Sequence, residues 1–271
     1  MNWLQALVLG AVQGLTEFLP VSSSGHLVLF QAAMGVEGEM LLFDTMLHVG
    51  TLIAIFILVW KDVLALLKKP FSTLMLYLVI ATIPTVIAAL FFKDQIDAAF
   101  NSKAGMPLGI GFLVTSVIMF VTPLFKRDRF EMEKMGVLRP FIIGIAQALA
   151  ILPSVSRSGS TIFAGLASGV KREDAARFSF LMAIPAILGS VVFQAKDIVE
   201  VGVGQAVDIS LILIVVAGMI VAAVTGYLAL KLLIDIVKKG KLWVFGIYTT
   251  VLGLMVIFDT LVTHIVFKTA F

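Results

Sequence analysis

The chain has 271 residues, of which 60% are hydrophobic and 14% are charged, whereas a soluble domain carries about 25% charged residues. This composition argues against a soluble protein. The net charge of +3 is small enough to come from loops that face anionic lipid, so we expect no nucleic-acid partner. Cysteine is absent, which excludes disulfides and thiolate chemistry. The start, Met1-Asn2-Trp3, lacks the positively charged region of a cleaved signal peptide.

The apolar segments, taken in chain order, predict an all-α polytopic membrane protein. Residues 2–35 come first, and helical spans of the bilayer are expected at 44–60, 73–92 and 106–125. Residues 139–170 come next, and further spans are expected at 176–193, 209–230 and 242–263. No long linker of Pro, Gly or Ser divides these segments, so we expect one membrane domain, residues 1–271.

The stretches 2–35 and 139–170 differ from the six spans, because a cluster of Pro, Ser and Gly interrupts each one in its middle. Pro and Gly break helices, and non-helical backbone at membrane depth survives only where protein or a watery cavity satisfies it. We therefore expect each stretch to be a re-entrant helical hairpin with its tip inside the membrane. A full span with a kink is the alternative.

The distribution of Lys and Arg orients the chain, because cytoplasmic loops of membrane proteins are enriched in these residues. The cation-rich segments 61–72, 126–139, 171–177 and 231–241 are placed in the cytoplasm, and the cation-poor segments 35–44, 93–106 and 194–208 are placed outside. This topology is consistent for all the segments only if both interrupted stretches return to the side of the membrane from which they came. Each half is then a re-entrant hairpin plus three transmembrane helices, and the halves have opposite orientation.

The two halves also share a sequence pattern, which supports an inverted-topology repeat of about residues 1–125 and 139–263. The first half contains Gly10, Gln13, Leu19-Pro20 and Ser22-x-Ser24-Gly25, and the second contains Gly144, Gln147, Leu152-Pro153 and Ser156-x-Ser158-Gly159. Chance similarity of two apolar hairpins is the alternative explanation. An inverted repeat with broken helices is the architecture that places a binding site near the midplane, where the halves meet.

Five ionisable residues in the membrane segments are candidates for function, because each costs a few kcal/mol in a bilayer. They are Glu17 and His26 on the first hairpin, Asp44 and His48 on the following span, and Arg157 at the tip of the second hairpin. If the repeat is correct, the two tips meet. One tip then supplies a carboxylate and an imidazole, and the other supplies a guanidinium.

The second tip has the composition of a phosphate cradle. Arg157 lies among Ser156, Ser158, Gly159, Ser160 and Thr161, and the first tip repeats the device with Ser22, Ser23, Ser24 and Gly25. A guanidinium fork, hydroxyl donors and the N-terminus of a restarting helix together favour an oxyanion. Two facing cradles would hold a diphosphate. The alternative for any single serine is that it caps backbone groups freed by Pro20 and Pro153.

Glu17 and His26 form the natural acid–base pair, although a helix-end carboxylate and a core histidine are the alternatives. Asp44 and His48 are i, i+4 neighbours that support the site or steady the membrane edge. Gln13 lies one turn before Glu17, where it orients that carboxylate or acts as a metal ligand. No motif with metal-ligand spacing is present, so any metal is expected to be a hard cation between Glu17 and phosphate oxygens.

The two long motifs resemble the signatures of the undecaprenyl-diphosphate phosphatase family, also called bacitracin-resistance proteins. The motifs are residues 13–26, QGLTEFLPVSSSGH, and residues 153–161, PSVSRSGST. The resemblance covers essentially the whole chain. Two positions depart from the family pattern: Gln13 stands where many members have Glu, which puts a two-carboxylate mechanism in doubt, and Ser154 replaces a common Gly.

The resemblance implies an enzyme that removes one phosphate from undecaprenyl diphosphate and recycles the carrier lipid for cell-wall synthesis. It also implies a bacterial cytoplasmic membrane, a site facing the outer side and help from Mg²⁺ or Ca²⁺. The family's acidic motif maps onto Gln13 and Glu17, its Ser/His group onto Ser23 and His26, and its arginine onto Arg157. A homodimer is left open.

Three attacking groups are compatible with these residues: Ser23, His26, or a water guided by Glu17. In each case Arg157 and the cradle would stabilise charge on the transferring phosphate. The rival hypothesis is a lipid-phosphate transporter, since inverted repeats also suit alternating access and fold alone does not decide function. The acid–base pair favours the enzyme, because a carrier needs only phosphate donors.

Overall fold

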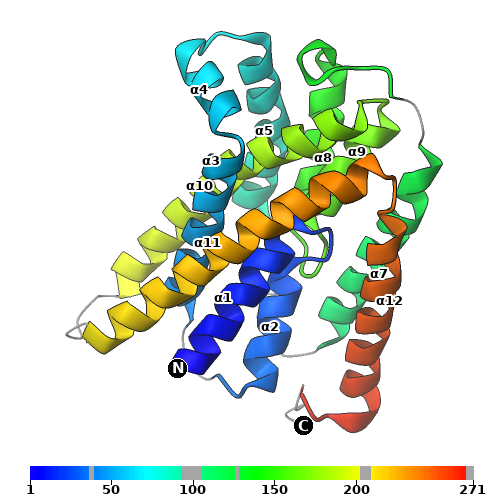
Figure 1. The fold of residues 1–271 in the computed structure, drawn as a ribbon. Helices are drawn as coiled ribbons and strands as arrows, with labels where there is room; N and C mark the ends of the chain where they lie inside the picture. The colour runs from blue at the N-terminus through cyan, green and yellow to red at the C-terminus, as the bar shows by residue number, and fades with distance from the viewer. Residues whose placement is uncertain (37–39, 93–94, 96–104, 126–127, 202–208, 267–271) are drawn as a thin grey trace.

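The computed structural model describes residues 1–36, 40–92, 95, 105–125, 128–201 and 209–266, and these residues are overwhelmingly helical (Figure 1). The helices are α1 (Trp3–Phe18), α2 (Ser23–Ala33), α3 (Leu41–Leu58), α4 (Trp60–Lys68), α5 (Thr73–Phe91), α7 (Gly105–Val121), α8 (Leu138–Leu149), α9 (Arg157–Ala167), α10 (Arg172–Val201), α11 (Ile209–Lys238) and α12 (Trp243–Phe258). Short helical turns follow at Thr122–Leu124, Met132–Lys134 and Asp259–Thr263. Within the described ranges, the strand-like pairing is one isolated bridge between Phe130 and Val170.

The six predicted spans are confirmed as helices long and apolar enough to cross a membrane. Within the described residues they are Leu41–Leu58, Thr73–Phe91, Gly105–Leu124, Arg172–Val192, Ile209–Lys238 and Trp243–Thr263. Many large apolar side chains on them face outward, as lipid-facing surfaces require. The chain is therefore an all-α, multi-pass membrane protein.

Two helices are longer than predicted, and most of the predicted loop 61–72 is helical. Both α10 and α11 have 30 residues, about 45 Å at 1.5 Å per residue, which exceeds a hydrocarbon core of about 30 Å, so each helix tilts or extends beyond that core at a polar end. Figure 1 shows both helices crossing the molecule obliquely. The segment 61–72 was expected to be a loop, but α4 forms there because Val63 and Leu66 bury one face of an amphipathic turn.

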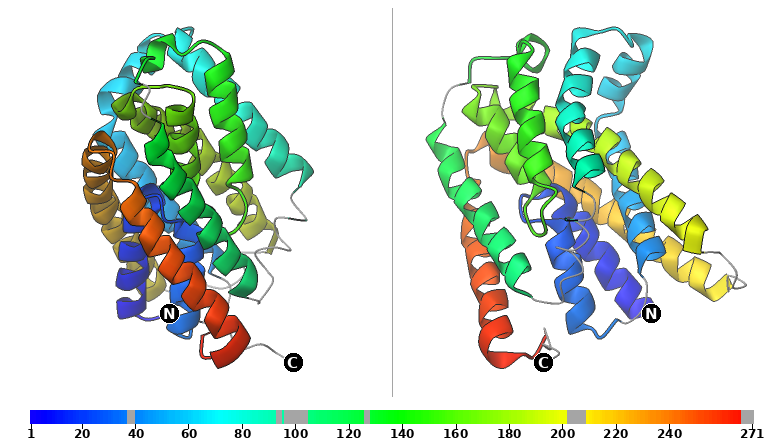
Figure 2. Two further views of the ribbon diagram at one scale, coloured as in Figure 1. Left: turned by 90° about the vertical axis from the view of Figure 1, so that its right-hand side faces the viewer. Right: turned by 180° about the vertical axis from the view of Figure 1, so that it is seen from behind.

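Each interrupted stretch forms two helices that fold back on each other. α1 packs against α2, and α8 packs against α9. The N-terminus and the turn of the first hairpin lie at opposite ends of α1 (Figure 1), and the second hairpin approaches from the other end of the molecule, with its turn near the centre (Figure 2). A kinked continuous helix is therefore wrong for both stretches. The opposed directions are those expected of an inverted repeat, which stays a prediction.

The first helix of each hairpin packs closely against a span from the other half. A Cβ on Gly10 of α1 would lie 2.4 Å from the carbonyl oxygen of Gly218 in α11, and a Cβ on Gly144 of α8 would lie 2.3 Å from that of Ala81 in α5. Small residues allow membrane helices to approach at backbone distance. Gly10 and Gly144 are the matched glycines of the sequence pattern, so the pattern marks equivalent interhelical contacts.

The cation-rich connections contact one another. Lys171 pairs with Glu131 at 2.9 Å, Lys238 with Glu173 at 3.1 Å, and Arg177 with Asp62 of α4 at 2.6 Å. α4 lies at the end of the molecule opposite both termini (Figure 1). The predicted cytoplasmic segments therefore share one end. The predicted outer loop 93–106 lies mostly outside the described residues. The predicted outer loop 194–208 is wrong for 194–201, which form the C-terminal part of α10, and its remainder, 202–208, lies outside the described residues.

Alanine at Gly144 should destabilise the protein, because its Cβ would overlap the Ala81 carbonyl and force α8 and α5 apart. Overpacking of this kind costs about 1–3 kcal/mol. The midpoint of thermal unfolding in detergent should fall for Gly144→Ala and for Gly10→Ala. Gly189→Ala is the matched control, since nothing lies within 4 Å of its added Cβ. Equal midpoints for all three variants would contradict the close approach.

Candidate active site

The two hairpin turns have similar local structure. Ser22 precedes α2 and accepts a hydrogen bond from the Gly25 N–H (3.5 Å), and Ser156 precedes α9 and accepts one from the Gly159 N–H (3.1 Å). These contacts are ordinary N-caps. Ser22 and Ser156 therefore cap N–H groups at the starts of α2 and α9, and their contact with phosphate stays a prediction.

The turns meet in the middle of the protein. The Ser158 hydroxyl of the second turn donates to the Leu19 carbonyl of the first (3.2 Å). A Cβ on Gly159 would lie 3.2 Å from Pro20, and a Cβ on Gly25 would lie 2.3 Å from the Ser154 hydroxyl. The expectation that the two tips meet is confirmed, and the motif glycines are what allow this approach.

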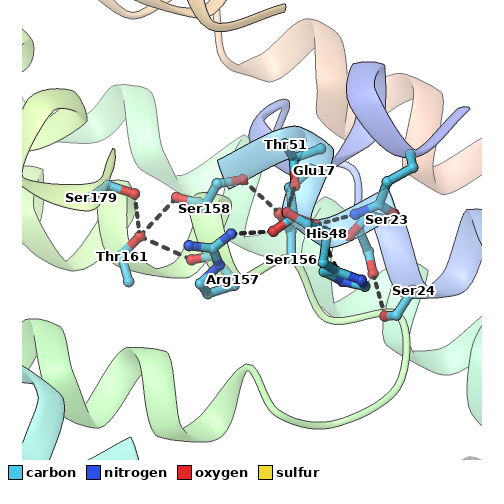
Figure 3. A network of polar contacts seen from close by, with 12 residues as sticks. Glu17, Ser23, Ser24, His48, Thr51, Ser156, Arg157, Ser158, Thr161 and Ser179 are labelled. Atoms are coloured by element: carbon cyan, nitrogen blue, oxygen red, sulfur yellow. Dashed lines mark hydrogen bonds and ion pairs between the residues drawn. The ribbon is translucent and has the colours of Figure 1, made fainter. Parts of the chain in front are cut away.

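Glu17, at the C-terminal end of α1, is the centre of the polar network between the turns (Figure 3). One carboxylate oxygen pairs with the guanidinium of Arg157. The other accepts from the Ser23 hydroxyl at 2.5 Å and from the Gln13 amide at 3.1 Å, and the Nε2 of His48 lies 4.0 Å from it. The carboxylate is 6% exposed, so its charge depends on these partners.

One side of this network is accessible. Ser23, Ser24, His48 and Arg157 are partly exposed, with His48 at 23% and the Arg157 side chain at 17%. A substrate phosphate that approached from this side would meet a guanidinium, two hydroxyls and an imidazole. The first N–H groups of α9 also lack intrahelical partners, as at any helix start.

His26 does not lie beside Glu17 as the sequence suggested. His26 begins the second turn of α2, four residues after Ser22, and its Nδ1 lies 2.7 Å from the Ser22 carbonyl oxygen. Its Nε2 lies 2.7 Å from the hydroxyl of Tyr248. The ring packs edge-on against Phe112 of α7. The helix turns the His26 ring towards α7 and α12, so both of its nitrogens contact groups other than Glu17. The imidazole that lies within 4.0 Å of the Glu17 carboxylate is that of His48, and an acid–base role for either histidine stays a prediction.

Asp44 and His48 lie on one face of α3 as predicted, but their side chains do not pair directly. The Nδ1 of His48 lies 2.7 Å from the Asp44 backbone carbonyl, whereas the Asp44 carboxylate accepts from Gln31 of α2 (2.8 Å). Because a carbonyl only accepts, His48 carries its proton on Nδ1 and directs Nε2 towards Glu17. Asp44 instead ties α3 to the first hairpin.

Apart from the partly exposed Ser24, the remaining cradle residues are buried, and most have partners within the protein. Ser24 contacts the hydroxyl of Ser22 at 3.3 Å. The Thr161 hydroxyl donates to the Arg157 carbonyl (2.9 Å) and lies 2.7 Å from the Ser179 hydroxyl of α10. Ser160 is 5% exposed. Thr161 therefore helps to fix the backbone that carries Arg157.

Sequence reasoning missed four residues that complete the site: Gln31, Thr115, Ser179 and Tyr248. Thr115 of α7 donates to the Ser154 carbonyl and accepts from the Ser156 N–H, both at 3.0 Å, and so holds the second turn. The available signal was a polar residue inside an apolar span. The neighbouring sequence does not distinguish a polar residue that contacts a distant element from one that hydrogen-bonds to the backbone of its own helix.

The oxygen donors around Glu17 are of the kind that would hold a hard divalent cation, which stays a prediction. The Oε1 of Gln13 is buried and has no hydrogen-bond partner in the described part of the chain, and it lies on the residue that contacts Glu17. One carboxylate and one amide oxygen, completed by phosphate and water, match the usual environment of protein-bound Mg²⁺. The described residues contain no cluster of three acidic, His or Cys side chains that could hold a metal alone.

Two other cavities are less suited to phosphate chemistry. A cavity of about 450 Å³ at the cation-rich end is lined mainly by five acidic residues and two cations. Both cations, Lys171 and Arg177, already pair with Glu131 and Asp62, so the remaining charge is negative and disfavours phosphate. Lys171 and Lys134 lower the pKa of Glu131 to about 2. A groove of about 480 Å³ between α4, α5 and α10 is lined almost entirely by apolar side chains.

Comparison with known proteins gives one consistent result. The family model described as bacitracin resistance protein BacA matches residues 6–255. A protein of Carboxydothermus hydrogenoformans named undecaprenyl-diphosphatase is 45% identical over 257 residues, which cover 95% of this chain and 97% of the relative. Undecaprenyl-diphosphatase 4 of Bacillus thuringiensis is 44% identical over the same shares. The undecaprenyl-diphosphatase of Methanosphaera stadtmanae is 38% identical, covering 95% and 98%.

Glycine at position 154 should stabilise the protein. Ser154 has a left-handed φ of 60°, and its buried hydroxyl has no partner in the described residues. The left-handed backbone costs a non-glycine residue about 1–2 kcal/mol, more than the roughly 0.4–1 kcal/mol of extra chain entropy that glycine brings to the unfolded state.

Ser154→Gly should therefore raise the midpoint of thermal unfolding in detergent by a few degrees. Ser168→Gly is the control, because Ser168 has an ordinary φ of −79° and gains nothing from glycine. A midpoint that falls in both variants would show that the Ser154 backbone is not strained.

Proposed function

Because this chain belongs to the family of the bacitracin resistance protein BacA, we propose that it hydrolyses undecaprenyl diphosphate to undecaprenyl phosphate and inorganic phosphate. The product is the carrier lipid that cell-wall synthesis reuses. Relatives that share 38–45% of their residues over nearly their full length carry this activity in their names. The observation that carries the proposal is the contact of Glu17 with both Ser23 and Arg157.

Arg157 binds and polarises the phosphate. Without substrate its charge is compensated by Glu17, so neither buried charge is left unpaired. A diphosphate that enters from the accessible side offers oxygens to the same guanidinium, which can contact two of them at once. Charge that develops on the phosphoryl oxygens then meets a fixed positive group in a water-poor site.

Ser23 is the attacking group that the geometry favours. Its hydroxyl already donates to Glu17, which is the arrangement of a nucleophile with its base. The Ser23 oxygen bonds to the terminal phosphorus as the bond from that phosphorus to the bridging oxygen breaks. Glu17 receives the hydroxyl proton and passes it to the departing lipid phosphate. Water then attacks the phosphorus of the phosphoserine as its bond to the Ser23 oxygen breaks. A proton of that water passes through Glu17 to the Ser23 oxygen, which restores Ser23 and releases inorganic phosphate.

His26 is a weaker candidate for the attack, because both of its ring nitrogens are engaged. A transporter would need Arg157 and the hydroxyl donors but no base beside Ser23, and the relatives are named as phosphatases. The enzyme is therefore preferred to the carrier.

Glu17 and Gln13, whose Oε1 has no partner among the described residues, would hold a divalent cation, Mg²⁺ or Ca²⁺. It would supply neutralising charge to the diphosphate. Because Gln13 contributes no negative charge, this site holds one carboxylate and depends more on substrate phosphate to complete the ligand set.

The proposal also includes the membrane in which the protein lies, its orientation and its oligomeric state. The protein lies in a bacterial cytoplasmic membrane with its cation-rich end in the cytoplasm and its site open to the outer side. Two inverted repeats, 1–125 and 139–263, place the site where their turns meet, which the opposed hairpins support. The prenyl tail lies in the bilayer against the helices, and a homodimer is compatible with this arrangement.

Purified protein in detergent should release phosphate from undecaprenyl diphosphate, and folded Arg157→Ala should release at least about a thousandfold less. EDTA should stop release, and added Mg²⁺ or Ca²⁺ should restore it. Absence of release by folded wild-type protein with either cation would overturn the proposed function. Phosphate release that persists in EDTA would refute only the requirement for a divalent cation.

Acid quenching during turnover of diphosphate labelled at the terminal phosphorus should leave label on the protein. The label should resist acid, as phosphoserine does, and should be absent from Ser23→Ala. Acid-labile label would instead indicate phosphohistidine. Turnover with no labelled protein would indicate direct attack by water, and either result contradicts attack by Ser23.

A further inference from the structure

Tyr248, on the last span α12, reaches across the protein to the first hairpin. Its hydroxyl lies 2.7 Å from the Nε2 of His26, and the two rings stack with centroids 5.6 Å apart and an interplanar angle of 11°. The His26 ring is 2% exposed, whereas Tyr248 is 47% exposed. The tyrosine therefore covers the histidine from the outer surface of the helix bundle.

The protons in this contact can be assigned from chemistry. The Nδ1 of His26 lies 2.7 Å from the Ser22 carbonyl, and a carbonyl only accepts, so Nδ1 carries the hydrogen. A neutral imidazole then has its lone pair on Nε2, and the Tyr248 hydroxyl donates to it. Tyr248, His26 and the Ser22 carbonyl form one directed chain of hydrogen bonds.

The end of this chain is a strained backbone. Ser22 has φ 71° and ψ 105°, a conformation that non-glycine residues rarely adopt and that persists only when the surroundings enforce it. Its carbonyl is held by both the ring and the backbone N–H of His26, the latter at 3.3 Å. Ser23 comes next in the chain and donates to Glu17, so the Ser22 conformation sets where the Ser23 hydroxyl lies.

We propose that Tyr248 is a positioning residue that acts through His26: the hydrogen-bond chain from its hydroxyl to the Ser22 carbonyl holds the first turn so that Ser23 faces Glu17. This inference rests on the proposed phosphatase function. It assigns to His26 a role in holding the turn, in place of attack on phosphorus. It also couples the C-terminal span to a site built by the two hairpins.

Removal of the hydroxyl alone separates this role from packing, because phenylalanine keeps the stacked ring. Tyr248→Phe should lower kcat for phosphate release by about 10-fold to 100-fold, the range for small misplacements of a reacting group, while KM stays within about twofold. Tyr227→Phe is the matched control. Tyr227 lies on α11 against Lys231 and should leave both constants unchanged.

A spectroscopic readout tests the contact directly. The chain has three histidines, so ¹⁵N spectra of the labelled imidazoles are simple, and His26→Ala identifies the relevant signal. The Nε2 resonance of His26 should move in Tyr248→Phe and stay in place in Tyr227→Phe. In a His26→Ala background, Tyr248→Phe should cause no further loss of kcat.

An unmoved His26 resonance, an unchanged kcat in Tyr248→Phe, or a further loss in the His26→Ala background would each overturn the inference. If wild-type protein releases no phosphate, the proposed function is wrong. In that case, a His26 resonance that does not move in Tyr248→Phe would also refute the hydrogen bond. A resonance that does move would support the hydrogen bond and refute only its role in catalysis.

Discussion

The ion pair between Glu17 and Arg157 is the interaction on which the rest of the site depends. The two residues are 140 positions apart, and each occupies the turn region of a different hairpin. Either charge alone would be left in a low-dielectric interior, where removal of one partner of a buried pair typically costs about 3–5 kcal/mol. The turns therefore have to meet. The close glycine contacts and the bond from Ser158 to Leu19 make that meeting geometrically possible.

This constraint explains why the proposed catalytic residues Glu17, Ser23 and Arg157 lie at the ends of helices. Each turn is fixed by an N-cap, a strained serine backbone and a donor or acceptor from a distant span: His26 with Tyr248 at the first turn, and Thr115 at the second. Non-helical backbone inside a membrane protein must be satisfied by neighbouring protein. The same bonds that satisfy the turns also hold Ser23 and Arg157 at Glu17.

Much of this was predictable from the sequence. Hydropathy located the six spans, and the clusters around Pro20 and Pro153 located the hairpin turns, because both signals are local. The approach of Glu17, Ser23 and Arg157 followed from the repeat. The choice between His26 and His48 did not follow, since it depends on the direction in which α2 and α3 present their faces. Tyr248 lies 222 residues from His26, and no spacing rule links them. The length of α10 and α11 was underestimated because polar ends extend a helix beyond its apolar part.

The most direct test of the account is a double-mutant cycle on phosphate release with Glu17→Gln, Arg157→Met and both together, each confirmed as folded. Because both residues act in one reaction centre, each single variant should lose nearly all activity, and the double variant should be no slower than the worse of the two. Losses that multiply, or a single variant that keeps a tenth or more of wild-type turnover, would contradict a site built jointly by the two turns.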